Sequence, residues 1–191
     1  MHERMKDPRK YLIVSLLMLL WPVMTVRGQG RGTPGRAVEA GGLFSTKGCG
    51  VALVFPRPDG TAAELRLLSD FAQVLRGHEY YPGAKLQYLY RLRVQERTVS
   101  DELSVRLTAG PGLTVGAVRD HGKGDGLLAA LCGSITADFQ FSKVPVTVSA
   151  GLSADLGAHL VFKEWHESTM TLYRNGLRKV WQPEISIRYR F

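Results

Sequence analysis

The sequence predicts an all-β fold, an eight-stranded antiparallel up-and-down β-barrel that crosses a membrane and has a polar lumen filled by side chains. Three observations support this prediction. Long segments alternate between apolar and polar residues with the two-residue period of a β-strand. Several of these segments exceed the roughly 9–11 residues that a tilted strand needs to cross a bilayer. The polar positions carry charges of both signs, as expected for side chains that face one another across a narrow lumen.

Residues 1–28 are expected to be a secretory signal peptide rather than part of the barrel. Four basic residues precede an apolar run, residues 11–26, which Pro22 interrupts. This run is shorter than the roughly 20 residues of a membrane-spanning helix. Cleavage is expected after Gly28, which leaves residues 29–35 as a flexible N-terminal segment and residues 36–191 as the barrel.

Eight segments of the mature chain are expected to be strands, an even number as in bacterial outer-membrane barrels. The clearest is residues 144–162, where apolar residues occupy every second position throughout. The first is weak and rich in glycine, but without it the long and short connections would exchange sides. In chain order the expected strands are 38–44, 51–55, 63–75, 86–94, 103–117, 127–141, 144–162 and 182–191.

The connections alternate in length, and this alternation predicts which end of the barrel faces outward. The short connections are 56–60, 96–101 and 142–143, and the long ones are 76–84, 119–126 and 163–181. Outer-membrane barrels have short periplasmic turns and longer external loops. The long connections are therefore expected outside, with 45–48 as a short first external loop and Phe191 at the periplasmic end.

The second face of the predicted strands is strongly charged. Its members are Glu64, Arg66, Asp70, Arg91, Arg93, Arg106, Asp138, Asp155, Glu184, Arg188 and Arg190. An arginine that faces hydrocarbon at the bilayer midplane costs about 2–4 kcal/mol, so the arginines together would exceed the roughly 5–15 kcal/mol net stability of a domain. These charges are expected to face the lumen and pair there. A soluble, lipocalin-like barrel would instead place the apolar face inside.

The last strand carries the most specific pattern, because its apolar face ends in aromatic residues at the carboxyl terminus. These positions are Ile185, Ile187, Tyr189 and Phe191. They resemble the terminal strand of bacterial outer-membrane β-barrels, which the barrel-assembly machinery reads as a signal. The mature chain as a whole resembles the small eight-stranded proteins of the OmpX and OmpA transmembrane-domain type. The resemblance implies an integral outer-membrane protein surrounded by lipid and lipopolysaccharide.

Candidate chemistry is sparse in this sequence. Cys49 and Cys132 are expected on opposite faces of distant strands, so they should not form a disulfide. No cysteine or histidine spacing indicates a metal site, and no cofactor is expected. The net charge of +8 is dispersed along the chain, which argues against a nucleic-acid partner.

One cluster has a catalytic composition. His166 and Ser168 stand two residues apart, so on an extended chain they share a face and the imidazole could activate the hydroxyl. The pair resembles the His-x-Ser element of outer-membrane lipid A deacylases, in which an acidic residue orients the histidine, and Glu184 is the candidate here. Thr169 stands where that family has asparagine, and the spacing to Glu184 is longer than in the family pattern.

Three functional hypotheses follow. The leading one is a monomeric, non-enzymatic outer-membrane protein that is structural or presents a ligand through its external loops. The second is a lipid A-modifying esterase at the outer leaflet, and the third is a small accessory subunit of a larger outer-membrane complex. An open porin is not expected, because eight strands enclose a lumen that their own side chains nearly fill.

Overall fold

A computed structural model describes residues 37–71, 82–120, 125–162, 168–173 and 182–191. Among these residues no helix is long and apolar enough to cross a membrane. The signal peptide and the segment 29–35 lie outside the described residues. The strands are β1 (Glu39–Ser45), β2 (Gly48–Pro56), β3 (Ala62–Asp70), β4 (Gly83–Ser100), β5 (Leu103–Arg119), β6 (Asp125–Phe141), β7 (Val146–Phe162), β8 (Ser168–Leu172) and β9 (Gln182–Arg190).

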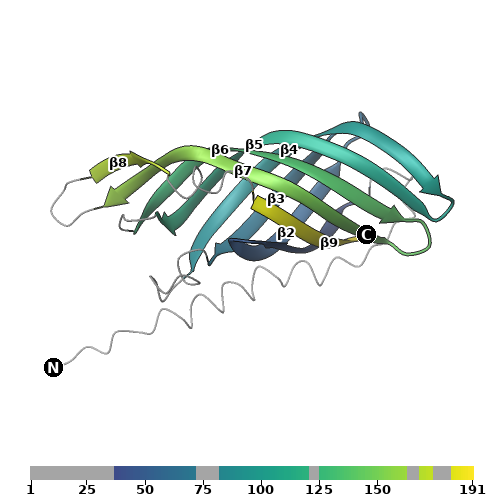
Figure 1. The fold of residues 1–191 in the computed structure, drawn as a ribbon, viewed down its shortest axis with the longest axis horizontal. Helices are drawn as coiled ribbons and strands as arrows, with labels where there is room; N and C mark the ends of the chain where they lie inside the picture. The colour runs from purple at the N-terminus through teal and green to yellow at the C-terminus, as the bar shows by residue number, and fades with distance from the viewer. Residues whose placement is uncertain (1–36, 72–81, 121–124, 163–167, 174–181) are drawn as a thin grey trace, which may run out of the picture. The chain divides into compact units, whose positions relative to one another are not determined.

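The strands form one antiparallel sheet that closes on itself (Figure 1). Each strand from β1 to β7 pairs with the next, and β9 pairs with both β7 and β1. Closure gives each strand of the barrel a hydrogen-bonded neighbour on both sides over its central part, which is the condition for a β-structure to exist in hydrocarbon. The predicted eight-stranded up-and-down barrel is thereby confirmed.

The eighth strand of the barrel is interrupted, which the sequence did not predict. β8 pairs with β7 at Ala158–Phe162, and β9 pairs with the same edge of β7 at Val146–Ser153. Together β8 and β9 occupy the place of one strand. The expectation that all of 163–181 is an external loop was therefore wrong. The edge of β7 beyond Ser153 offers unpaired backbone groups, and β8 satisfies them by continuing the sheet.

β4 is also longer than the predicted strand 86–94, because it continues to the turn Asp101–Glu102. Its pairing with β5 contains register irregularities, one between Arg93 and Gln95 and one between Thr98 and Ser100. At such a bulge the regular alternation of faces is lost, because two residues oppose one on the partner strand. The position that faces the lumen therefore changes parity along β4.

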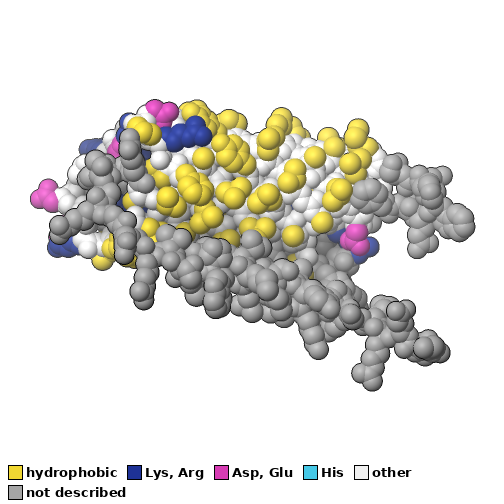
Figure 2. All heavy atoms as spheres, turned by 180° about the vertical axis from the view of Figure 1, so that it is seen from behind, with side chains coloured by type: hydrophobic (Ala, Val, Ile, Leu, Met, Phe, Trp, Pro, Cys, Tyr) yellow, Lys and Arg dark blue, Asp and Glu magenta, His cyan; other side chains and the backbone are white. Residues whose placement is uncertain are grey.

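The apolar side chains lie on the outside of the barrel. Figure 2 shows hydrophobic side chains spread over the outer wall. Along β6, Leu127, Leu131 and Ile135 are exposed, and the residues between them are mostly buried. Leu156 and Ile187 are likewise more than half exposed. In water such a continuous apolar surface would drive association, but in a bilayer it is the required exterior. The lipocalin-like alternative places these residues inside, so it was wrong, and the fold is a transmembrane barrel.

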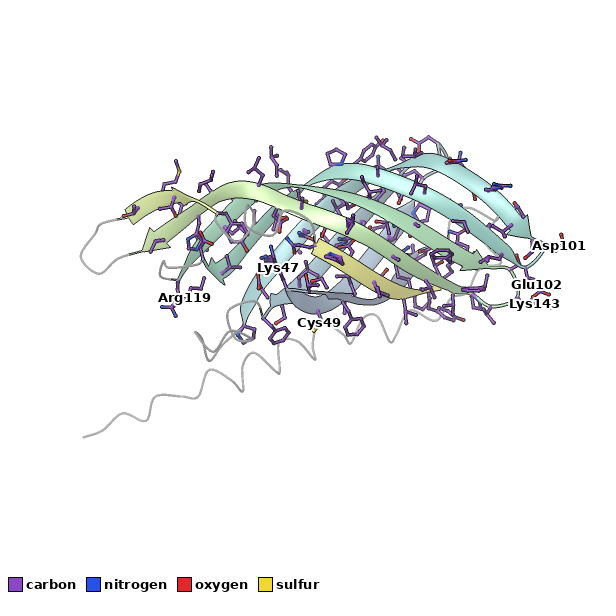
Figure 3. All side chains as sticks on the ribbon, viewed as in Figure 1. Lys47, Cys49, Asp101, Glu102, Arg119 and Lys143 are labelled. Atoms are coloured by element: carbon purple, nitrogen blue, oxygen red, sulfur yellow. The ribbon has the colours of Figure 1, made fainter. Side chains whose placement is uncertain are left out.

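The two ends of the barrel differ. The turns 57–61, 101–102 and 142–145 lie at the end where β9 finishes, and the labelled Asp101, Glu102 and Lys143 mark this end (Figure 3). Parts of the long connections at the opposite end lie outside the described residues. In the turn 57–61 the hydroxyl of Thr61 donates a 2.7 Å hydrogen bond to Asp59, which lowers the pKa of that carboxyl. By the rule of short periplasmic turns this end is expected to face the periplasm, and we refer to it as the periplasmic end.

Candidate functional site

An arginine between two carboxylates lies at the centre of the lumen. Arg66 of β3 donates to Glu64 across 2.7 Å and to both oxygens of Glu184 of β9 across 2.9 Å. All three side chains are buried. Because two parallel N–H···O bonds between guanidinium and carboxylate are among the strongest hydrogen bonds in proteins, this contact joins β3 to β9 through the middle of the barrel.

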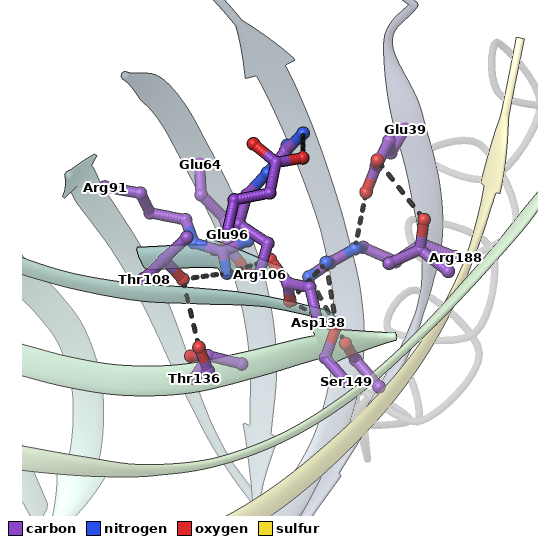
Figure 4. A network of polar contacts seen from close by, with 12 residues as sticks. Glu39, Glu64, Arg91, Glu96, Arg106, Thr108, Thr136, Asp138, Ser149 and Arg188 are labelled. Carbon is purple, nitrogen blue, oxygen red and sulfur yellow. Dashed lines mark hydrogen bonds and ion pairs between the residues drawn. The ribbon is translucent and has the colours of Figure 1, made fainter. Parts of the chain in front are cut away.

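A second group of charges lies around Asp138 of β6 (Figure 4). Asp138 accepts from Arg91 at 2.7 Å and from Arg188 at 2.9 Å, and the hydroxyl of Ser149 donates to it at 2.6 Å. Arg188 also donates to Glu39 of β1 at 2.9 Å. Arg91 lies 3.3 Å from a Glu64 oxygen, which connects this group to Arg66. The result is one continuous network across the lumen.

Lys85 is at the centre of a third group of polar contacts, in the half of the lumen away from the short turns. Its ammonium lies 2.6 Å from Asp70, 3.8 Å from Asp155 and 3.0 Å from the hydroxyl of Tyr173. Lys85 and Tyr173 are almost fully buried. Lys85 thus forms ion pairs with carboxylates of both β3 and β7.

Apolar side chains pack beside this lysine. Tyr173, Val118, Leu128 and Ala130 form a buried cluster. The imidazole of His159, also buried, lies 2.9 Å from the carbonyl of Val118 through its Nε2 atom. Lys85, His159 and this cluster are thus buried side chains inside the outward half of the barrel.

The predicted lumen charges differ in how deeply they are buried. The buried ones are Glu64, Arg66, Arg91, Asp138, Asp155, Glu184 and Arg188. Asp70 is largely covered and pairs with Lys85. The remaining three, at the periplasmic end, are partly exposed, namely Arg93, Arg106 and Arg190. Arg190 donates to the carbonyls of Phe141 and Val144 rather than to a predicted acid.

Among the described residues, the sequence reasoning missed several buried or lumen-facing charges, including Glu39, Lys85 and Glu96. Glu39 lies on the predicted first strand 38–44, whose faces were not assigned, and Lys85 lies before the predicted start of its strand. Glu96 was assigned to a turn, but the bulge between Arg93 and Gln95 places it opposite Arg106. Glu96 is 2.9 Å from both Arg93 and Arg106, so two guanidinium groups share one carboxylate.

The proposed catalytic arrangement was wrong in its acidic member. Glu184 pairs with Gly151 of β7, whereas Ser168 pairs with Phe162, eleven residues further along that strand. At about 3.3 Å per residue these positions are about 36 Å apart. Both carboxylate oxygens of Glu184 also bind Arg66. Glu184 therefore cannot orient a histidine beside Ser168, and His166 itself lies outside the described residues.

Cys49 and Cys132 are both free thiols. Cys132 is buried in the barrel, and Cys49 is partly exposed. Within the described ranges no three histidine, cysteine or acidic side chains are grouped so that they could hold a metal ion.

A cavity of about 990 Å³ occupies the periplasmic end of the lumen. Its lining includes residues of the turns 57–61 and 142–145, and the Asp138 network borders it on the inner side. The lumen is thus crossed by the Asp138 network at its centre and contains this cavity on the side of the periplasmic end. This cavity and the network above it are the candidate functional site.

No known family model and no curated protein matches this sequence. Among solved structures the chain is similar to the crystal structure of Neisserial surface protein A (NspA), with 14% sequence identity and a TM-score of 0.41, covering 81% of this chain and 94% of that chain. The class of protein follows from the strand pairing, the apolar exterior and the buried ion pairs described above. It is a small transmembrane β-barrel whose lumen is crossed by charged side chains.

Proposed function

We propose that this protein is a non-enzymatic, monomeric barrel of the bacterial outer membrane that is structural or presents a ligand through its external connections. The observation that carries this proposal is the charged network through Arg66 and Asp138. This network crosses the lumen and obstructs the path that an open pore would need. Opening a path would require separating buried ion pairs, and a buried charge that loses its partner costs about 3–5 kcal/mol.

The location in the outer membrane rests on two further proposals. One is that residues 1–28 are a signal peptide that is removed, and the other is that Ile185, Ile187, Tyr189 and Phe191 are read by the barrel-assembly machinery. Lipid and lipopolysaccharide would then surround the apolar exterior. Fractionation of cells, with sequencing of the amino terminus of the membrane-bound protein, tests both the location and cleavage after Gly28.

The purified protein is expected to give no steady conductance in a planar lipid bilayer, because side chains occupy the centre of its lumen. A sixteen-stranded porin measured in the same bilayer is the positive control, since barrels of that size have an aqueous channel. Stable current steps of porin-like size from the folded, heat-modifiable protein would contradict the proposal.

Deletion of Phe191 is expected to reduce the amount of folded protein in the outer membrane severalfold. The reason is the proposed role of the terminal aromatic residue as an assembly signal. Phe191→Tyr, which keeps an aromatic ring, is the control and should assemble as the parent does. The amount of heat-modifiable protein in the outer-membrane fraction measures both. Normal assembly of the deletion would remove the terminal residue from the assembly signal.

The other two hypotheses have direct measurements. An esterase would remove an acyl chain from lipid A, which mass analysis of lipid A with and without the protein detects. The distance between Glu184 and Ser168 argues against it. An accessory subunit would co-purify with larger proteins, which native sizing after mild detergent extraction detects. A monomeric size supports the leading proposal.

A further inference from the structure

Basic side chains outnumber acidic ones around the periplasmic cavity. The cationic residues of its lining are Arg57, Arg91, Arg93, Arg106, Lys143 and Arg190. The acidic residues of the same lining are Glu39, Glu96 and Asp138. Glu39 and Asp138 both bind Arg188, which lies deeper in the lumen. Arg91 also pairs with Glu64, and Lys143 pairs with Glu102. The excess of positive charge at the cavity therefore lies with Arg93, Arg106 and Arg190, which have Glu96 as their one acidic partner among the described residues.

Several of these guanidinium groups also keep unused hydrogen-bond donors. Arg93 and Arg106 share the single carboxylate of Glu96. Arg190 donates to carbonyl groups, and no acidic partner of Arg190 is found among the described residues. The Nε atoms of Arg91, Arg106 and Arg190 are buried but have no hydrogen-bond partner in the described part of the chain. Buried donors without a partner are uncommon in proteins, and a bound ligand is one way to supply the partner.

We propose that this cavity binds a small soluble anion that carries two or more phosphate or carboxylate groups, with Arg93, Arg106 and Arg190 as its principal ligands. The planar arginine fork matches the oxygens of both groups. A volume of about 990 Å³ accommodates a molecule of this size. Because the barrel wall separates the cavity from the lipid, the ligand enters from the periplasm. The site goes beyond the proposed function, since a plugged barrel need not bind any ligand.

Isothermal titration calorimetry on the full chain, purified from outer membranes in a non-ionic detergent, tests the site. The probes are sodium pyrophosphate and sodium citrate, with chloride at equal ionic strength as the reference. We expect saturable one-site binding of at least one probe and none of chloride. The better probe shows whether phosphate or carboxylate is preferred. Heats from both probes that match those from chloride would overturn the proposal.

The variant Arg93→Gln/Arg106→Gln is expected to weaken binding at least tenfold. Arg97→Gln is the matched control, because Arg97 is on the same strand but pairs with Val105, on the face opposite the Glu96–Arg106 pair. It removes one positive charge, where the double variant removes two, without touching a residue of the cavity lining, and it should leave the affinity within twofold of the parent. Equal weakening by Arg97→Gln would show that general charge, not a site, attracts the anion.

A variant that is expected to increase the anion affinity keeps the proposal testable if the double arginine variant does not fold. Glu96→Gln removes the carboxylate that competes for Arg93 and Arg106, so it should strengthen anion binding severalfold. Heat-modifiable gel mobility shows whether each variant is folded. If the double arginine variant does not fold, the test rests on Glu96→Gln. An anion affinity of Glu96→Gln that is equal to or weaker than that of the parent would overturn the proposal.

Discussion

Replacing Asp138 with alanine is expected to destabilise the barrel by about 3–5 kcal/mol, the usual cost of removing one partner of a buried ion pair. Asp138 accepts from both Arg91 and Arg188. Without it, both guanidinium groups remain buried, and Ser149 loses its acceptor. The temperature at which the folded, fast-migrating gel band converts to the unfolded one should fall clearly below that of the parent.

Glu102→Ala is the matched control for this prediction. Glu102 also forms an ion pair, with Lys143, but these side chains are 61% and 73% exposed. Exposed pairs contribute about 0–1 kcal/mol, so the transition should stay close to that of the parent. Equal losses in the two variants would mean that the Asp138 network does not hold the strands together. Since Asp138 contacts side chains from β4, β7 and β9, its removal acts on the whole barrel.

The alternation of apolar and polar residues along each strand made most of this fold predictable from the sequence. A transmembrane strand has lipid on one face and a narrow lumen on the other, so each side chain is sorted by the period of two alone. The sorting of Leu152 and Ile187 outward and of Arg66 and Arg188 inward follows from that rule.

The alternation rule fails where the backbone departs from regular pairing. The bulge beside Gln95 shifts parity, which is why Glu96 was not predicted to face Arg106. Bulges depend on the partner strand and leave no mark in the period of one strand. The division of the last strand into β8 and β9 was missed for a related reason. A five-residue strand such as β8 is too short for its period to be distinguished from a loop.

The candidate site was less predictable than the fold. Which acid binds which arginine depends on the relative positions of strands distant in sequence, as for Arg66 and Glu184. Glu184 fails as the acidic member of the supposed catalytic group on the same ground, because sequence spacing does not report distance along a barrel wall. The cavity could not be foreseen either, since it arises where the charged side chains stop filling the lumen.

Substituting Leu131 by arginine is expected to destabilise the protein in membranes by about 2–4 kcal/mol, the cost of this charge at the midplane of a bilayer. Leu131 is 66% exposed in the middle of β6. Its cross-strand neighbours Leu113 and Leu156 also face outward, so no carboxylate is available beside it on either strand. The substituted guanidinium would have to reach the headgroups past these leucines.

Val99→Arg is the control that separates membrane depth from simple exposure. Val99 is 61% exposed, similar to Leu131, but it lies next to the turn Asp101–Glu102 at the periplasmic end. Near the interface the same substitution costs about 0–1 kcal/mol. Unfolding by urea in lipid vesicles should therefore show a clear loss for Leu131→Arg and little change for Val99→Arg. In a barrel surrounded by water both positions would tolerate arginine, because exposed substitutions usually alter stability by less than about 0.5 kcal/mol. Two equally small effects would thus contradict the transmembrane exterior itself, independently of any functional proposal.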